Sequence, residues 1–191
     1  MKNEIMIDAE TTGRNPGCKV LTLGAFGFNI YGEQVRFYER FDFSKMGAAG
    51  LFDEQETIDW WFQQREEIRK EAFEGKTNPS DGLANFKMFL LSNFDLDKDS
   101  GFRVWCCGAD FDFPILKEFF RRFGFAIPWK FYQQCDYRTV KNLFPSIKSE
   151  EGEKVEHVAI EDAMAQMRGL RCFYKLVQNT EKSQQRGAEN D

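Results

Sequence analysis

The stretch that decides the fold is I-M-I-D-A-E-T-T-G, residues 5–13. Ile5, Ile7 and Ala9 alternate with Met6, Asp8 and Glu10, which is the period of a β-strand with one apolar face. Asp8 and Glu10 then project to the same side of that strand. The pattern predicts an N-terminal strand that carries two neighbouring carboxylates at its end.

Two interpretations fit Asp8 and Glu10. Charged groups at the end of an apolar strand are costly to bury without a partner, so the pair could hold a cation. Alternatively, both could mark the solvated end of an edge strand. The T-T-G at residues 11–13 favours the cation, because two hydroxyls and a glycine let the backbone come close to a ligand.

The remaining pattern places strands first and helices later. A strand over 20–30 is followed by turn residues 31–33 and by a third strand that ends near residue 43, which predicts a hairpin. The elements expected next are helices over 58–73, capped by Thr57, and over 83–91, a strand over 103–107 and a helix over 111–123. The last expected helix has one apolar face that runs from Ala163 to Val177.

Length and composition describe one folded domain. A chain of 191 residues fits a single core, and 42% hydrophobic residues exclude a disordered chain. We expect the domain to span 1–180 and a loose polar tail to follow over 181–191. No window approaches the roughly 20 apolar residues of a membrane helix, and the N-terminal apolar run is too short for a signal peptide. A cytoplasmic protein without membrane contact is therefore expected.

Charge and cysteine content exclude two further classes of protein. The net charge of -5 argues against a broad basic face for duplex DNA, so nucleic acid would be bound locally, through metal ions and a few cations. The 5 cysteines form no C-x-x-C pair and no zinc-like cluster, so we expect reduced thiols.

A second pair of carboxylates lies in A-D-F-D-F-P-I-L, residues 109–116, at a junction from strand to helix. Asp110 is the better candidate for the helix cap. Asp112 would then stand in the first turn, where the helix dipole favours an anion. Capping alone could explain either residue, so this motif by itself leaves a structural and a chemical role open.

The third motif is H-V-A-I-E-D, residues 157–162, before the last helix. His157 is the only histidine in the chain. A lone histidine is more often structural than catalytic, but the spacing places His157 in the loop while Asp162 is held on the helix. An exposed imidazole beside a fixed carboxylate favours a chemical role.

The three motifs in this order resemble the DEDDh, or DnaQ-like, 3′-5′ exonuclease superfamily: D-x-E, then F-D, then H-x-x-x-x-D before a terminal helix. The sequence is most similar to a branch that contains bacteriophage exodeoxyribonucleases and small bacterial exoribonucleases. The segments that carry this similarity are T-I-D-W-W-F-Q-Q at 57–64, W-C-C-G-A-D-F-D-F-P-I-L at 105–116, P-W at 128–129 and D-Y-R-T at 136–139.

This resemblance implies an α/β, RNase H-like fold with a mixed sheet flanked by helices. It also implies a metal-dependent 3′-5′ exonuclease that acts on 3′ ends of single-stranded DNA or RNA and releases nucleoside 5′-monophosphates. The implied metal ligands are Asp8, Glu10, Asp112 and Asp162. The implied general base is His157, and Asp110 matches a variable position.

The implied cofactors are two divalent metal ions, Mg²⁺ or Mn²⁺, because hard carboxylate oxygens suit these ions. Held about 3.5 to 4 Å apart, they would clamp the scissile phosphate and stabilise the leaving oxygen. Imidazole side chains titrate near neutral pH and can accept the proton of the attacking water.

Four further residues are expected to contact the substrate: Thr11, Thr12, Trp61 and Arg138. Trp60 and Trp61 point about 100° apart on a helix, so one could pack in the core while the other stacks on a base, although plain core packing of both is the more common arrangement. Arg138 could reach a phosphate with its planar guanidinium or form a salt bridge with Asp136. The alternative to an enzyme is a non-catalytic module of the same fold that binds single-stranded ends.

Overall fold

A mixed sheet of five strands forms the centre of the structure, in the order β3-β2-β1-β4-β5. The computed structural model describes residues 1–152 and 154–188. The strands are β1 (Glu4–Thr11), β2 (Val20–Phe28), β3 (Gln34–Arg40), β4 (Arg103–Cys106) and β5 (Gln134–Asp136). β1 pairs antiparallel with β2 and parallel with β4, so it lies in the middle of the sheet. The predicted hairpin of β2 and β3 is confirmed.

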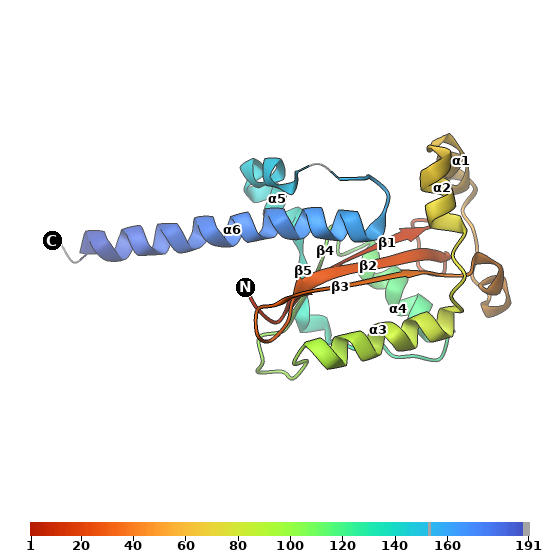
Figure 1. Ribbon diagram of the computed structural model, residues 1–191, viewed down its shortest axis with the longest axis horizontal. Coiled ribbons are helices and arrows are strands. Elements are labelled where there is room, and N and C mark those ends of the chain that lie inside the picture. The colour runs from red at the N-terminus through yellow and green to blue at the C-terminus, as the bar shows by residue number, and fades with distance from the viewer. Residues whose placement is uncertain (153, 189–191) are drawn as a thin grey trace.

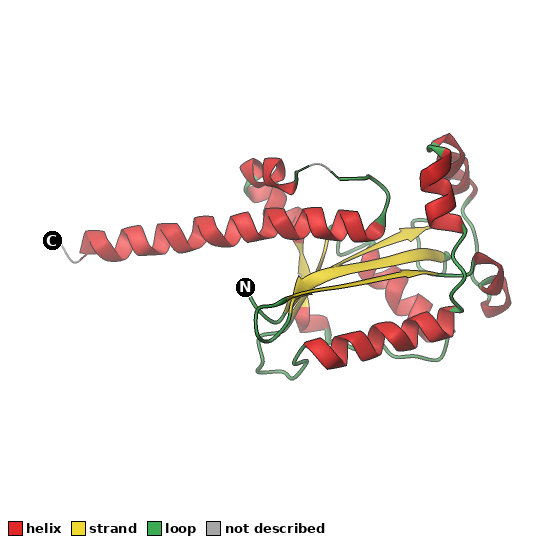
Figure 2. Cartoon of the chain, viewed as in Figure 1, coloured by secondary structure: helices red, strands yellow, loops and turns green. Residues whose placement is uncertain are grey.

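Helices cover both faces of the sheet (Figure 1). One face carries α5 (Tyr137–Leu143) and α6 (Ala159–Ala188), and the other carries α3 (Pro79–Asn93) and α4 (Asp112–Arg122). Figure 2 shows the strands in yellow between these two layers of helices in red. α1 (Gln55–Gln63) and α2 (Glu66–Phe73) lie beyond the end of β1. Short 3-10 helices lie at Phe43–Lys45, Gly47–Ala49, Phe131–Gln133 and Pro145–Glu151.

The alternation along β1 divides its side chains between two cores. Ile5 and Ile7 are buried in a cluster with residues of α3 and α4, whereas Met6 is buried with Ala163 and Met167 of α6. Side chains two residues apart share a face of the sheet. The carboxylates that follow Met6 at every second position therefore project toward the face that α6 covers.

The single helix predicted over 58–73 is wrong, because the chain breaks into α1 and α2 at Gln64, where the backbone is extended. The break lets the rings of Trp61 and Phe73 meet with their centroids 5.6 Å apart. In one continuous helix, these two residues would be about 18 Å apart along the axis. Burial of an aromatic pair therefore overrides the helical pattern here.

The helix predicted from Leu83 begins earlier, at Pro79. The side chain of Asn78 accepts a hydrogen bond from the Ser80 N–H at 3.0 Å. Asn at the cap and Pro at the first helical position start a helix, because Pro lacks only an N–H that would have no helical partner there. The Asn-Pro pair thus starts the helix four residues before Leu83.

The loose tail predicted from residue 181 differs from the structure, in which α6 continues to Ala188. Residues 181–186 include Glu, Lys, Gln and Arg, whose helix propensities are close to that of Ala, which favours a helix over a loose tail. Figure 1 shows this end of α6 running beyond the sheet. Residues 189–191 lie outside the described residues. None of the helices described has both the length and the apolar composition needed to cross a membrane.

Candidate active site

A cleft of about 610 Å³ lies where the parallel strands β1 and β4 both end, beside α1 and the start of α6. It brings together residues from both ends of the chain. All five predicted catalytic or metal-binding residues line it: Asp8, Glu10, Asp112, His157 and Asp162. The cleft therefore unites the three sequence motifs.

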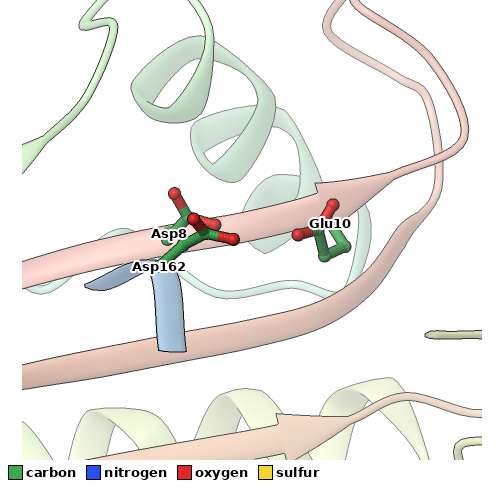
Figure 3. Close-up of side chains that lie close together, drawn as sticks. All are labelled: Asp8, Glu10 and Asp162. Carbon is green, nitrogen blue, oxygen red and sulfur yellow. The ribbon is translucent and has the colours of Figure 1, made fainter. Parts of the chain in front are cut away.

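Three carboxylates form the centre of the cleft. One oxygen from each of Asp8, Glu10 and Asp162 lies within 4.8 Å of the others. Figure 3 shows the carboxylate of Asp162 beside that of Asp8, with Glu10 farther along the same strand. We call Asp8, Glu10 and Asp162 the carboxylate cluster. Asp112, buried in the first turn of α4, lines the same cleft but is outside this cluster.

Burial and mutual repulsion disfavour the charged forms of these acids. Burial, and next the charge of Asp162, raises the pKa of Asp8 to about 7. Burial and the charge of Asp8 likewise raise the pKa values of Glu10 and Asp112 well above their usual range. Nearby positive charge would lower these values again. Hard oxygens gathered within a few ångströms, together with this need for positive charge, fit a divalent cation such as Mg²⁺ or Mn²⁺.

Three neighbours of the cluster hold its carboxylates by hydrogen bonds. Gln166 Nε2 donates to Asp8 Oδ1 at 2.9 Å, and the backbone N–H of His157 donates to Asp162 Oδ2 at 3.0 Å. The Lys154 ammonium forms an ion pair with Asp162 Oδ1. Asp8 is therefore held from α6, and Asp162 is held from the loop that precedes α6.

Sequence reasoning missed Lys154 and Gln166. Gln166 follows Asp162 by four residues, so helical spacing places both on one face of α6 and could have revealed it. Lys154 lies in a loop before α6, where no period links a residue to a face. Its place beside Asp162 follows only from the path of the backbone.

His157 stands in the loop before α6, as predicted, with a backbone φ of 62°. Positive φ is uncommon outside glycine, although His is enriched among the exceptions, and such residues concentrate at functional sites. The imidazole ring lies 4.7 Å from the ring of Trp60, at an interplanar angle of 89°. Trp60 of α1 therefore contacts the histidine from the opposite wall of the cleft.

The two tryptophans divide their roles, and the core position belongs to Trp61. Trp61 is 2% exposed, and its indole N–H donates to the carbonyl of Thr11 at 2.8 Å. Trp60 is 37% exposed. Both line the cleft, but Trp60 has the larger exposed surface. The residue named from the sequence, Trp61, mainly supports the strand that carries the carboxylates.

The structure separates the two threonines. Thr11 lines the cleft, although its hydroxyl donates to the carbonyl of Gly13 at 2.6 Å. Thr12 is fully buried and lies outside the cleft lining. Its hydroxyl donates to the carbonyl of Phe52 and accepts the Lys19 N–H, each at 3.2 Å. These bonds give the Thr12 side chain a structural role.

Arg138 lines the cleft, and its Nη2 donates to the carbonyl of Cys107 at 2.8 Å. In the described part of the chain, Arg138 makes no salt bridge with Asp136. The Asp136 carboxylate instead accepts the N–H groups of Arg138 and Thr139 and caps α5.

The prediction that Asp110 caps α4 is wrong. Phe111 occupies the cap position of α4 and makes no side-chain hydrogen bond there.

Comparisons with known proteins agree with this geometry. Residues 3–173 match a family described as the 3′-5′ exoribonuclease Rv2179c-like domain. The chain is also 30% identical over 161 residues to an exodeoxyribonuclease of Enterobacteria phage T4, a match that covers 71% of this chain and 69% of the phage protein.

Solved structures of nucleases share the fold. E. coli Exonuclease I in complex with a dT13 oligonucleotide matches with a TM-score of 0.58 at 14% identity, over 92% of this chain. This chain spans only 40% of the Exonuclease I chain. Cell-death related nuclease 4 matches with a TM-score of 0.54 at 12% identity, over 91% of this chain and 64% of its own.

These structural matches confirm the predicted RNase H-like fold, with its mixed sheet flanked by helices. The match to the family over residues 3–173 shows the family of the chain, because it extends over most of the chain and contains every residue that lines the cleft. The chain therefore belongs to the family of 3′-5′ exoribonuclease Rv2179c-like domains.

Proposed function

We propose that this protein is a metal-dependent 3′-5′ exonuclease that hydrolyses the terminal phosphodiester bond of single-stranded DNA or RNA and releases nucleoside 5′-monophosphates. The observation that carries this proposal is the carboxylate cluster, which lies in one cleft with a histidine. The family of the chain and its phage relative support the same reaction.

The residues that would hold two divalent ions are Asp8, Glu10, Asp112 and Asp162. When bound, such ions neutralise charge on the scissile phosphate and activate the attacking water. The protein's contribution is to fix the ligands: Gln166 orients the Asp8 carboxylate, and the His157 N–H orients that of Asp162. Residues that orient metal ligands in this way strongly affect metal affinity.

His157 would accept the proton of the attacking water on an imidazole nitrogen. Its backbone N–H donates to Asp162, and the residue lines the same cleft as the cluster. The edge-to-face contact with Trp60 restricts the rotation of that ring. A general base must lie within hydrogen-bond distance of the proton that it removes. The contacts with Asp162 and Trp60 would hold His157 in position for this step.

Trp60 and Arg138 are the proposed substrate contacts. Trp60 is partly exposed in the cleft and can stack on a terminal base, which is a contact that tolerates any base. Arg138 uses one of its N–H donors for the carbonyl of Cys107, and the others would bind a phosphate. The solved Exonuclease I structures contain dT13 and dA16 oligonucleotides, which supports a single strand as the ligand.

The test uses matched single-stranded DNA and RNA oligonucleotides with a label at the 5′ end. We expect progressive shortening from the 3′ end and release of 5′-monophosphates with Mg²⁺ or Mn²⁺, and neither in chelator. Asp8→Asn should bind the oligonucleotide without shortening it. Binding without release by the wild type in metal would favour the non-catalytic module, and cleavage in chelator would contradict the metal site.

A further inference from the structure

The ion pair between Lys154 and Asp162 brings a positive charge into the carboxylate cluster. The two side chains are only 22% and 11% exposed, so the pair is shielded from solvent. The Lys154 charge also lowers the pKa values of Asp8 and Glu10, against the effects of burial and of the neighbouring carboxylates. Lys154 therefore acts on all three members of the cluster.

Both oxygens of Asp162 are engaged by residues 154–157 of the preceding loop. Oδ1 pairs with the Lys154 ammonium, and Oδ2 accepts the His157 N–H. A divalent ion bound to Oδ1 would lie within a few ångströms of the ammonium. Like charges at such a distance repel strongly in a partly buried site.

We propose that Lys154 is the resident counter-cation of the carboxylate cluster, and that a divalent metal must displace its ammonium from Asp162 in order to bind. The inference rests on the proposed metal site. It gives Lys154 two opposed effects: the ion pair stabilises the protein without metal, and it weakens metal binding. Lys154 is thus a determinant of metal affinity and is not itself a ligand.

A second ion pair in the same cleft provides a matched control. Lys141 Nζ lies 3.4 Å from Glu151 Oε1, and these side chains are 24% and 12% exposed. Glu151 lines the cleft but is not a member of the carboxylate cluster. Removal of the Lys141 charge therefore changes the net charge of the cleft equally, without freeing a cluster oxygen.

The experiment is calorimetric titration of Mn²⁺ and of Mg²⁺ into the protein without nucleic acid. Lys154→Met should bind metal about tenfold more tightly than the wild type, because the metal no longer has to displace the Lys154 ammonium from Asp162. Lys154→Arg retains the charge and should stay near the wild type, as should Lys141→Met. Circular dichroism checks that each variant is folded, and Lys154→Gln replaces the Met variant if that is insoluble.

Thermal melts supply a second readout. In chelator, Lys154→Met should melt below the wild type, and saturating metal should raise its melting temperature by more than that of the wild type. Equal metal affinity of Lys154→Met and wild type would overturn the inference. An increase in the metal affinity of Lys141→Met as large as that of Lys154→Met would overturn it as well. If those results came with intact metal-dependent nucleotide release, the proposed function would stand. Absence of both metal binding and release would overturn both.

Discussion

Asp110 and Asp112 are two residues apart, yet the structure gives them different surroundings. Asp112 is buried at the cleft, in the first turn of α4, whereas Asp110 is exposed on the loop before the helix. Either could cap a helix by sequence alone. The backbone resolves the choice, because it turns only the Asp112 side chain toward the cleft.

We therefore predict that Asp112→Asn lowers the rate of nucleotide release by at least about 100-fold, since even residues that only orient metal ligands cost 10- to 100-fold. Asp110→Asn is the matched control and should retain the wild-type rate. The measurement is single-turnover release of nucleotide at saturating metal. The opposite ranking of the two variants would show that the motif has been assigned to the wrong aspartate.

His157→Ala tests the proposed base. The variant should lose about 100-fold in rate or more, because the attacking water then has no general base, while calorimetry shows unchanged metal affinity. A variant that keeps the wild-type rate at saturating metal would contradict the assignment.

The sequence was sufficient to predict many of the residues that line the cleft, but it did not predict which side chains contact one another there. The alternation on β1 placed Asp8 and Glu10 on one side, and helical spacing placed Asp162 at the start of α6. It could not show that Thr12 turns into the core or that Lys154 reaches Asp162. Both outcomes depend on the path of loops, which has no repeat that a sequence could display.

Among the elements, β1, β2, β4 and α4 lie where the sequence placed them, and α6 lies at the predicted helix but continues past residue 180 to Ala188. Two short elements, β5 and α5, were not predicted. β5 has three residues and α5 has seven, too few to establish a period. The split between α1 and α2 arises from a tertiary contact, the Trp61 and Phe73 pair, which no local pattern contains.

Asp136 joins two of these short elements. Its carboxylate accepts the backbone N–H groups of Arg138 and Thr139 in α5 and that of Gly108 after β4. Burial opposes its ionisation, but these hydrogen bonds and that of the Thr139 hydroxyl hold the pKa of Asp136 below its usual value. Its charge therefore stabilises the folded chain above pH 3.8, and this stability is lost as pH falls through the lower folded value.

We predict that Asp136→Ala lowers the free energy of unfolding by about 1 to 2 kcal/mol at pH 7, and that Asp136→Asn costs less because Asn is also a good cap. Urea unfolding monitored by circular dichroism measures both. In acid below pH 3.8, the gap between wild type and Asp136→Asn should shrink. A gap that is independent of pH would mean that the charge contributes nothing.

At the scale of the whole molecule, the buried carboxylates of the cleft lower the free energy of unfolding when no metal is bound. The pKa of Asp8 is raised from 3.8 to about 7, so the folded chain holds a proton there that the unfolded chain has already released. The free energy of unfolding must then fall as pH climbs from about 4 to about 7. Metal that binds only the folded protein would restore this loss.

Asp8→Asn should therefore melt higher than the wild type in chelator above pH 7, although it is inactive. The Asn side chain can still accept the Gln166 hydrogen bond and carries no charge. We expect a shift of a few degrees, since about 1 kcal/mol corresponds to about 2 to 4 °C in a domain of this size. The shift should vanish near pH 4, and saturating Mg²⁺ should raise the melting temperature of the wild type more. A lower melting temperature for Asp8→Asn at every pH would contradict the repulsion.

The order of the chain has a consequence for synthesis on the ribosome. Asp8 and Glu10 are made early, in the first strand, whereas Asp162 belongs to the last helix. A growing chain thus has two members of the carboxylate cluster long before it has the third. The complete cluster arises only when α6 has been made and packs on β1. An unfinished polypeptide, still held on the ribosome that reads its messenger RNA, therefore carries an incomplete site.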